Sequence, residues 1–131
     1  MITADTIGVI DDLVLTKPKD QADAYRMWQM LSDTSHEIWT AVCISVIDAS
    51  QIVDQAVICE CTKVTFVKIT QAMMATYWAS GEPQDKAVAY AIQGGAMAWV
   101  LSIDGSYTNV VGLPLAQTLA LIDKMALQTV N

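Results

Sequence analysis

The stretch from Ser80 to Gly94 combines residue types that can bind a ligand. It contains the carboxylates of Glu82 and Asp85 and the ammonium group of Lys86, in a run interrupted by glycine and proline. These groups can hold a phosphate or a metal ion, and Gln93 could offer a donor and an acceptor to the edge of a nucleobase. Carboxylates this close repel one another unless a cation lies between them. The stretch is therefore either the polar wall of a binding site or an exposed charged turn.

A second pair of an acid and a lysine lies near the N-terminus. Asp5 precedes an apolar run and Lys17 follows a predicted hairpin over residues 6–16, whose turn is Asp11-Asp12. Because the two strands fold back on each other, Asp5 and Lys17 can lie at the same end of the hairpin. A carboxylate and an ammonium group there would suit a metal-bound phosphate. A solvated surface pair is the alternative interpretation.

The histidine and the cysteines favour structural roles. His36 is the only histidine, and no nucleophile pattern accompanies it. Cys59 and Cys61 would face the same way on a strand, where they are either small buried hydrophobic residues or a metal pair without further ligands nearby in the sequence. With Cys43 they make an odd number without a leader peptide, which predicts reduced thiols in a cytoplasmic protein.

Length and composition predict one domain over residues 1–131. Hydrophobic residues make up 53% of the chain, enough for a sizeable core. The net charge of −7 and the lack of a basic stripe argue against nucleic-acid binding. No apolar run is long enough to span a membrane, and the first residues do not resemble a signal peptide.

Hydrophobic periodicity predicts three helices. Asp20 caps the first, with Asp23 in the capping-box position, and Thr70 caps the second over residues 71–79, which ends at Gly81. The third follows Pro114. The predicted inner positions are, in the first helix, Ala24, Met27, Trp28 and Leu31 and, in the third, Leu115, Leu119, Ile122 and Ala126.

Alternating runs predict the strands. Residues 36–48 and 51–69 are joined by a turn at 48–50, and the first run is apolar on both faces, which indicates a central strand covered on both sides. Within the second run, residues 57–67 are long enough to bend or bulge midway. Further strands are expected over 96–103 and 107–111. Together these elements predict a mixed α/β fold with a largely antiparallel sheet flanked by helices.

Four segments resemble those of the Maf-like nucleoside triphosphate pyrophosphatases, a family once called septum formation inhibitors. They occur in the family's order and at its approximate spacing, and they are Ala4-Asp5-Thr6-Ile7, Lys17-Pro18-Lys19-Asp20, Ser80 to Gly94, and Gly105-Ser106-Tyr107 leading to Val110-Val111-Gly112-Leu113-Pro114. The third is similar to the branch acting on dTTP and UTP. The resemblance implies a Maf/inosine triphosphatase-like architecture. It also implies hydrolysis of a nucleoside triphosphate to monophosphate and pyrophosphate with Mg²⁺ or Mn²⁺.

The resemblance also implies roles for individual residues. Asp5 corresponds to the general base that activates water, and with Glu82 it is a candidate metal ligand. Thr6 and Gln93 match positions tied to base selection. The residues expected around the triphosphate and its metal are Lys17, Glu82, Asp85 and Lys86.

The sequence also departs from the family. Members begin with a strand and a Ser-x-x-Arg loop before the block at Ala4, whereas three residues precede Ala4 here, and Val88 and Ala91 replace glycines. The expected results are weak or absent pyrophosphatase activity of the chain alone and an uncovered sheet edge and apolar face that pair in a homodimer. The alternatives are a catalytically inactive, shortened relative that serves as a nucleotide-binding or dimeric interaction module, and an incomplete gene product.

Overall fold

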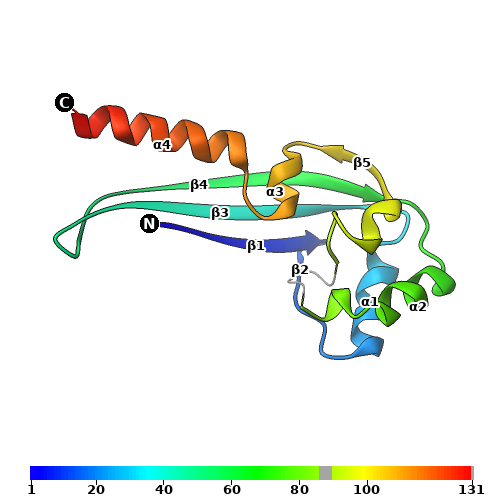
Figure 1. The fold of residues 1–131 in the computed structure, drawn as a ribbon. Coiled ribbons are helices and arrows are strands. Elements are labelled where there is room, and N and C mark those ends of the chain that lie inside the picture. Colours follow the sequence, from blue (N-terminus) through cyan, green and yellow to red (C-terminus); the bar gives the residue numbers. More distant parts are fainter. Residues whose placement is uncertain (86–89, 131) are drawn as a thin grey trace.

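A computed structural model describes residues 1–85 and 90–130, with the side chains of 84–85 and 127–130 left aside. Five strands form one sheet in the order β2-β1-β3-β4-β5, and every pairing is antiparallel. Helices flank this sheet, so the predicted fold class is confirmed (Figure 1). The elements are β1 Ile2–Ile10, β2 Leu13–Leu15, α1 Gln21–Leu31, β3 Ser35–Asp48, β4 Gln51–Phe66, α2 Gln71–Ala79, the 3₁₀ helices η1 Glu82–Asp85 and η2 Gly95–Trp99, β5 Val100–Asp104, α3 Tyr107–Val111 and α4 Leu115–Val130.

Two tight hairpins build most of the sheet. The turn residues Asp11 and Asp12 have φ of 48° and 65°, and Ala49 and Ser50 have φ of 51° and 66°. Two successive positive φ angles match the twist of the flanking strands, and both turns lie where the sequence predicts them. The β3–β4 ladder shifts register between Val46 and Ile47, near the hairpin turn, and the β4–β5 ladder shifts register between Thr65 and Phe66, so neither shift lies midway along residues 57–67.

The long hairpin of β3 and β4 extends away from the rest of the molecule. We call residues 42–58 of this hairpin the arm, along which α4 lies, and we call the part that contains α1, α2 and η2 the lobe (Figure 1). Two hydrophobic clusters correspond to these parts. The larger lies in the lobe, and the smaller one joins Val42 and Ile44 of the arm to Met125 of α4.

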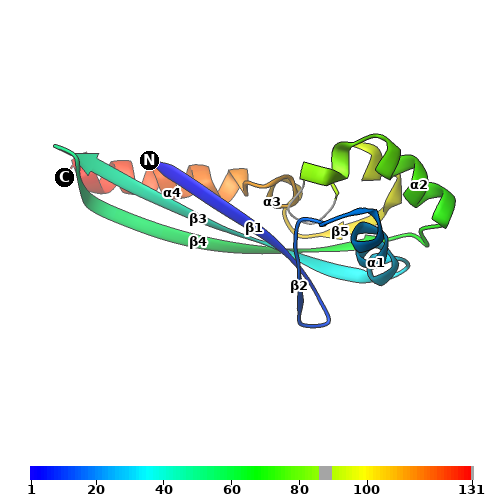
Figure 2. The same cartoon turned by 90° about the horizontal axis from the view of Figure 1, so that it is seen from below.

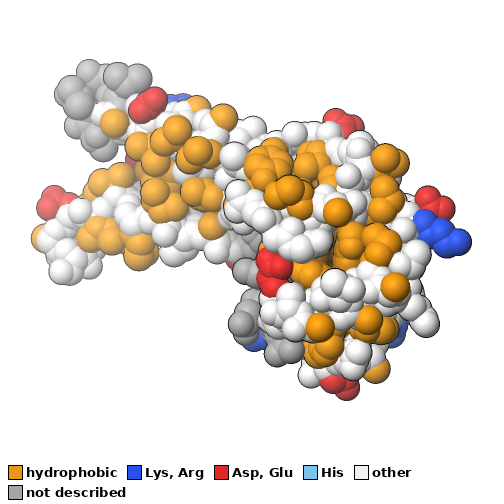
Figure 3. All heavy atoms as spheres, turned by 45° about the vertical axis from the view of Figure 1, so that its right-hand side comes forward, with side chains coloured by type: hydrophobic (Ala, Val, Ile, Leu, Met, Phe, Trp, Pro, Cys, Tyr) orange, Lys and Arg blue, Asp and Glu red, His pale blue; other side chains and the backbone are white. Residues whose placement is uncertain are grey.

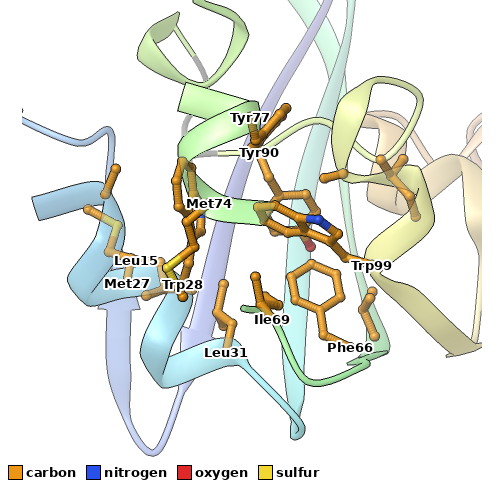
Figure 4. Packing of buried hydrophobic residues seen from close by; sticks show 14 of the residues in the cluster. Leu15, Met27, Trp28, Leu31, Phe66, Ile69, Met74, Tyr77, Tyr90 and Trp99 are labelled. Carbon is orange, nitrogen blue, oxygen red and sulfur yellow. The ribbon is translucent and has the colours of Figure 1, made fainter. Parts of the chain in front are cut away.

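The core of the lobe is aromatic (Figure 4). Trp28 of α1 is fully buried, and its ring centroid lies 5.5 Å from that of Tyr77 on α2 and 5.4 Å from that of Trp99 on η2. The Tyr77 and Trp99 centroids are 5.0 Å apart. Edge-on aromatic packing of this kind fixes the relative positions of the three elements. The predicted buried stripe of α1 and its Asp20 cap are both confirmed.

The strand predicted over 96–103 is confirmed only in its second half, and the strand predicted over 107–111 is wrong. Residues 95–99 form the helix η2, so that β5 begins only at Val100. Residues 107–111 form α3 instead of a strand, because the Ser106 hydroxyl accepts the Asn109 N–H at 3.1 Å and caps a helical turn. Asn109 is then directed into the sheet, where its side chain has three hydrogen-bond acceptors.

The inner face of α4 also differs from the prediction. Leu115 and Leu119 are 46% and 51% exposed, and Ala126 is exposed as well. The side chains that contact or are buried against the arm are those of Thr118, Leu121, Ile122 and Met125. The predicted stripe was therefore correct only at Ile122, because the rotation of α4 about its axis is set by the arm it packs against.

One face of the sheet is covered and the other is open. Along β3, Ile38, Thr40 and Val42 are buried, whereas Trp39 is 36% exposed and Ala41 is also exposed. Figure 2 is seen from below, with β1, β3 and β4 in front and α4 behind them. The prediction of a central strand covered on both sides is therefore wrong within the described residues. We call the side that carries Trp39 and Ala41 the open face.

Candidate functional site

Asp5 lies on the open face, between two shallow hollows. It pairs with Ala41 across the β1–β3 ladder, and Ala41 pairs with Cys59. Opposite residues in antiparallel strands share a face, so these three side chains form one row. A hollow of about 340 Å³ adjoins Asp5 on the Trp39 side, and one of about 220 Å³ adjoins it on the Cys43 side. An exposed carboxylate at this point is accessible to a ligand lying on the sheet.

The same segment of β1 has a free edge. β2 pairs only with residues Gly8 to Ile10, and within the described part of the chain no strand pairs with the outer edge of Ile2 to Ile7. Backbone N–H and C=O groups on such an edge are available to another strand or to a ligand. Asp5 and Thr6 therefore lie where an open face meets an open edge.

Thr6 is directed to the opposite, covered face, as successive strand residues must be. Its hydroxyl lies 2.9 Å from the hydroxyl of Thr40, and Thr40 donates to the backbone carbonyl of Asn109 at 3.2 Å. The Thr6 side chain thus belongs to a polar network under α3. Its role in base selection stays a prediction.

Lys17 lies at the end of the first hairpin, as expected. The β1–β2 ladder ends at the pair Gly8 and Leu15, so both Asp5 and Lys17 follow beyond it, away from the turn. Lys17 is exposed. The structure thus places the acid and the lysine at the same end of the hairpin.

The stretch from Ser80 to Gly94 is held by two side chains. Gly81 has φ of 77° and ends α2, as predicted. The Tyr77 hydroxyl accepts the Ala91 N–H at 2.8 Å, and the Glu82 carboxylate accepts the Gly95 N–H at 3.0 Å. Gln93 is exposed on the turn between these two contacts. The predicted site residues Asp85, whose backbone is in η1, and Lys86 have side chains outside the described residues, as does Val88.

The predicted metal ligands are not grouped into a protein-only metal site. Among the residues that the structure describes, no three His, Cys, Asp or Glu side chains are close enough to hold an ion together. Glu82 uses Oε2 as the acceptor for the Gly95 N–H. Of the two predicted metal ligands, only Asp5 has an exposed carboxylate. A hard cation bound there would need water and substrate oxygens to complete its coordination shell.

The cysteines share the open face with Asp5. Cys59 is exposed and Cys43 and Cys61 are half-buried, so the prediction of small buried residues is wrong for Cys59. The Cys61 thiol donates to Glu37 at 3.2 Å, and burial together with this carboxylate raises the pKa of the thiol to about 11. Cys61 is therefore an unreactive thiol at neutral pH.

A larger pocket of about 420 Å³ lies away from Asp5, between α2 and η2. Its walls are mostly apolar and carry no carboxylate or ammonium group; they are formed by Ala72, Met73, Thr76, Tyr77, Ser80, Gly95, Ala98 and Trp99. Figure 3 shows hydrophobic side chains gathered on both the lobe and the arm, with few charged groups between them. This pocket is larger than the two hollows beside Asp5, but only those hollows adjoin a carboxylate.

His36 links the stretch from Ser80 to Gly94 to the sheet. It is buried, and its Nε2 lies 2.6 Å from the hydroxyl of Tyr90, the residue just before the turn that carries Gln93. Its ring also packs edge-on against Phe66. The predicted structural role of His36 is confirmed. Tyr77 and Asn109 were not singled out, because their hydrogen bonds join segments far apart in the sequence.

We expect His36 to make the protein less stable in mild acid. Burial lowers the pKa of His36 from 6.5 to about 4, so the folded state binds fewer protons than the unfolded state between these values. The free energy of unfolding should therefore fall as pH decreases from 6.5 to 4, by about 3 kcal/mol from this residue. Urea unfolding at several pH values checks this, and the fall should be smaller in His36→Gln. An equal pH dependence in both proteins would contradict the assignment.

No helix in the described part of the chain is long and apolar enough to cross a membrane.

Comparison with known proteins gives a consistent result. A family model described as Maf-like protein matches residues 1–125. A dTTP/UTP pyrophosphatase of Psychrobacter cryohalolentis is 54% identical, over 95% of this chain and 62% of the relative. The corresponding proteins of Psychrobacter arcticus and Koribacter versatilis are 51% and 49% identical, over 95% and 89% of this chain and 61% and 58% of theirs. The chain thus spans about three-fifths of the length of these curated relatives.

Proposed function

This chain belongs to the Maf-like protein family, and on that premise we propose that it hydrolyses nucleoside triphosphates, dTTP and UTP, to monophosphate and pyrophosphate. The observation that supports this most is the position of Asp5. Its carboxylate is exposed between two hollows on the open face, within one of the four segments that resemble the family. The names of the relatives supply the substrates in this proposal.

In the proposed reaction, Asp5 orients a water molecule and accepts its proton as the oxygen attacks a phosphorus of the triphosphate. The P–O bond to the pyrophosphate group breaks, and the charge of the leaving group must be stabilised. Lys17, at the same end of the hairpin as Asp5, supplies one positive charge to the phosphate oxygens. With a chain charge of −7, further positive charge must come from elsewhere.

A divalent cation, Mg²⁺ or Mn²⁺, would supply that charge. The Asp5 carboxylate fits one of its ligand positions, because such ions are commonly held by one or two carboxylates and by the substrate's own oxygens. When bound, the ion neutralises the phosphates and lowers the pKa of a bound water. We propose Gln93 and Thr6 for base recognition, and Asp85 and Lys86 for the triphosphate.

The test is the release of pyrophosphate from dTTP, UTP, dCTP, ATP and GTP with Mg²⁺ or Mn²⁺. We expect dTTP and UTP to be the best substrates. The second candidate function, an inactive nucleotide-binding or interaction module, is favoured by the open face and the free edge of β1. It predicts no turnover but a higher melting temperature with nucleotide. Turnover with an equal preference for all five nucleotides would contradict the substrate assignment.

We also propose that a second copy of the chain covers the open face. Trp39 and Val57 are 36% and 64% exposed there, and a twofold contact through this face would bury both side chains. Light scattering at micromolar concentration is expected to give a dimer mass. Trp39→Glu should shift the mass towards the monomer, whereas Leu101→Glu, on β5, should not. A monomer mass for the unmodified chain would refute this arrangement.

A further inference from the structure

The residue proposed to recognise the base is carried by a tight turn. The Gly94 N–H donates to the Ala91 carbonyl at 3.1 Å, which closes a four-residue turn with Gln93 in its third position. Ile92 is buried beside it, whereas Gln93 is exposed. The orientation of the Gln93 amide therefore depends on how firmly the ends of this turn are held.

Two side chains hold those ends. At the first residue of the turn, the Tyr77 hydroxyl accepts the Ala91 N–H at 2.8 Å. Just after the turn, Glu82 Oε2 accepts the Gly95 N–H at 3.0 Å. Since Gly95 begins η2, the carboxylate accepts the first N–H of that helix.

The two holding residues are themselves connected. The Ser80 hydroxyl donates to the Tyr77 carbonyl at 2.6 Å and accepts the Glu82 N–H at 3.3 Å. The Tyr77 ring is locked in the aromatic core against Trp28 and Trp99. The contacts on the turn are therefore anchored to the aromatic core of the lobe.

The glycines of the turn fit the same explanation. A Cβ added at Gly94 would collide with the Glu82 carboxylate, and a Cβ at Gly95 would come within 2.7 Å of the Tyr77 ring. Both positions therefore need glycine so that these two side chains can approach the backbone. No ligand has to be invoked for the close approach.

We propose that Glu82 and Tyr77 are positioning residues that fix the turn presenting Gln93, and that the Glu82 carboxylate acts as an acceptor for backbone N–H rather than as a metal ligand. This rests on the proposed role of Gln93 in nucleotide recognition. If Glu82 is a positioning residue, a substitution should impair the protein only when it removes the hydrogen-bond acceptor. If Glu82 is a metal ligand, a substitution should impair the protein whenever it removes the negative charge.

Two substitutions at Glu82 separate these roles. Glu82→Gln removes the charge but keeps an acceptor oxygen, whereas Glu82→Ala removes both. We expect Glu82→Ala to speed amide hydrogen exchange at Gly95 about tenfold or more and to raise KM for dTTP with a smaller change in kcat. In Glu82→Gln, the exchange rate at Gly95 and the KM for dTTP should both stay within a few-fold of the values of the unmodified protein. The Mg²⁺ concentration for half-maximal activity should be unchanged in both variants.

A further substitution, with its own controls, tests the contact between the Tyr77 hydroxyl and the Ala91 N–H. Tyr77→Phe keeps the ring in the core but removes the hydroxyl, so exchange at Ala91 should rise while exchange at Gly95 stays the same. Tyr107→Phe, an exposed tyrosine on α3, and Asp48→Ala, an exposed acid at the tip of the arm, serve as matched controls without effect.

Some results would overturn the proposal. If Glu82→Gln is as damaging as Glu82→Ala and both need more Mg²⁺, Glu82 is a metal ligand. If exchange at Gly95 is unaffected in Glu82→Ala, the carboxylate does not hold the turn. If the unmodified chain neither turns over nor binds dTTP, the proposed function fails, while the exchange at Gly95 and Ala91 still decides whether the turn is held as described.

Discussion

Asp5→Asn is expected to lower the turnover of dTTP and UTP by about 10²–10⁴-fold, the range for loss of a general base. Asparagine has nearly the same shape, but its amide cannot accept a proton from water at neutral pH. Because the Asp5 side chain is exposed on the sheet surface, the free energy of unfolding should change by less than about 0.5 kcal/mol. Steady-state pyrophosphate release, measured beside a urea unfolding curve, checks both expectations.

The control for Asp5 is another exposed acid. Asp48→Asn, at the tip of the arm, makes the same chemical change on the same sheet. It should leave turnover unaltered. Full activity in Asp5→Asn would show that the base is elsewhere and would remove the main support for the proposed mechanism.

Asn109→Ala is expected to lower the free energy of unfolding by about 3–4 kcal/mol. Asn109 is fully buried, and its Nδ2 donates to the carbonyls of Ile38 and Glu60 at 3.1 and 3.2 Å. It also lies 3.0 Å from the Thr62 hydroxyl. Truncation leaves these acceptors without their donor in a site that water does not reach, and it creates a small cavity between α3 and the sheet.

Urea or guanidinium unfolding measures this effect, with Ser102→Ala on the exposed side of β5 as the control. The melting temperature should also fall in Asn109→Ala and stay unchanged in Ser102→Ala. A loss below about 1 kcal/mol would mean that α3 is not held to the sheet by Asn109. Thr40, which donates to the Asn109 carbonyl, would then be the residue to examine.

Local features of the sequence predicted local structure well. The hairpin turns at Asp11-Asp12 and Ala49-Ser50 and the caps at Asp20 and Thr70 depend on residues within a few positions of each other, and all are confirmed. The antiparallel pairing of β3 with β4 follows from the second of these turns.

Features set by distant contacts were not predictable in the same way. Residues 107–111 are rich in strand-forming side chains, yet they form a helix that Ser106 caps and that Asn109 attaches to β3 and β4. The rotation of α4 depends on the arm, which no local pattern records. The exposure of Trp39 likewise depends on what lies against the sheet rather than on β3 itself.

The same difference between local features and distant contacts applies to the candidate site. The resemblance identified Asp5, Lys17 and Gln93 from short segments, and the structure places Asp5 and Lys17 at one hairpin end. The contacts of Tyr77 and Glu82 with the turn span 14 and 13 residues, so spacing alone could not reveal them. Glu82 was selected from the sequence for its charge, whereas in the structure its carboxylate accepts a hydrogen bond from the Gly95 N–H.

The ladder between β1 and β3 determines which side of the sheet carries Asp5. Its register is unbroken from Ile2 to Val9, and Asp5 and Thr6 are consecutive within it. A slip of one residue would exchange them, moving the carboxylate under α3 and the threonine into solvent. Single-residue insertions or deletions in this strand should therefore be much less tolerated than substitutions, since each would invert the two sides of the site while leaving its composition intact.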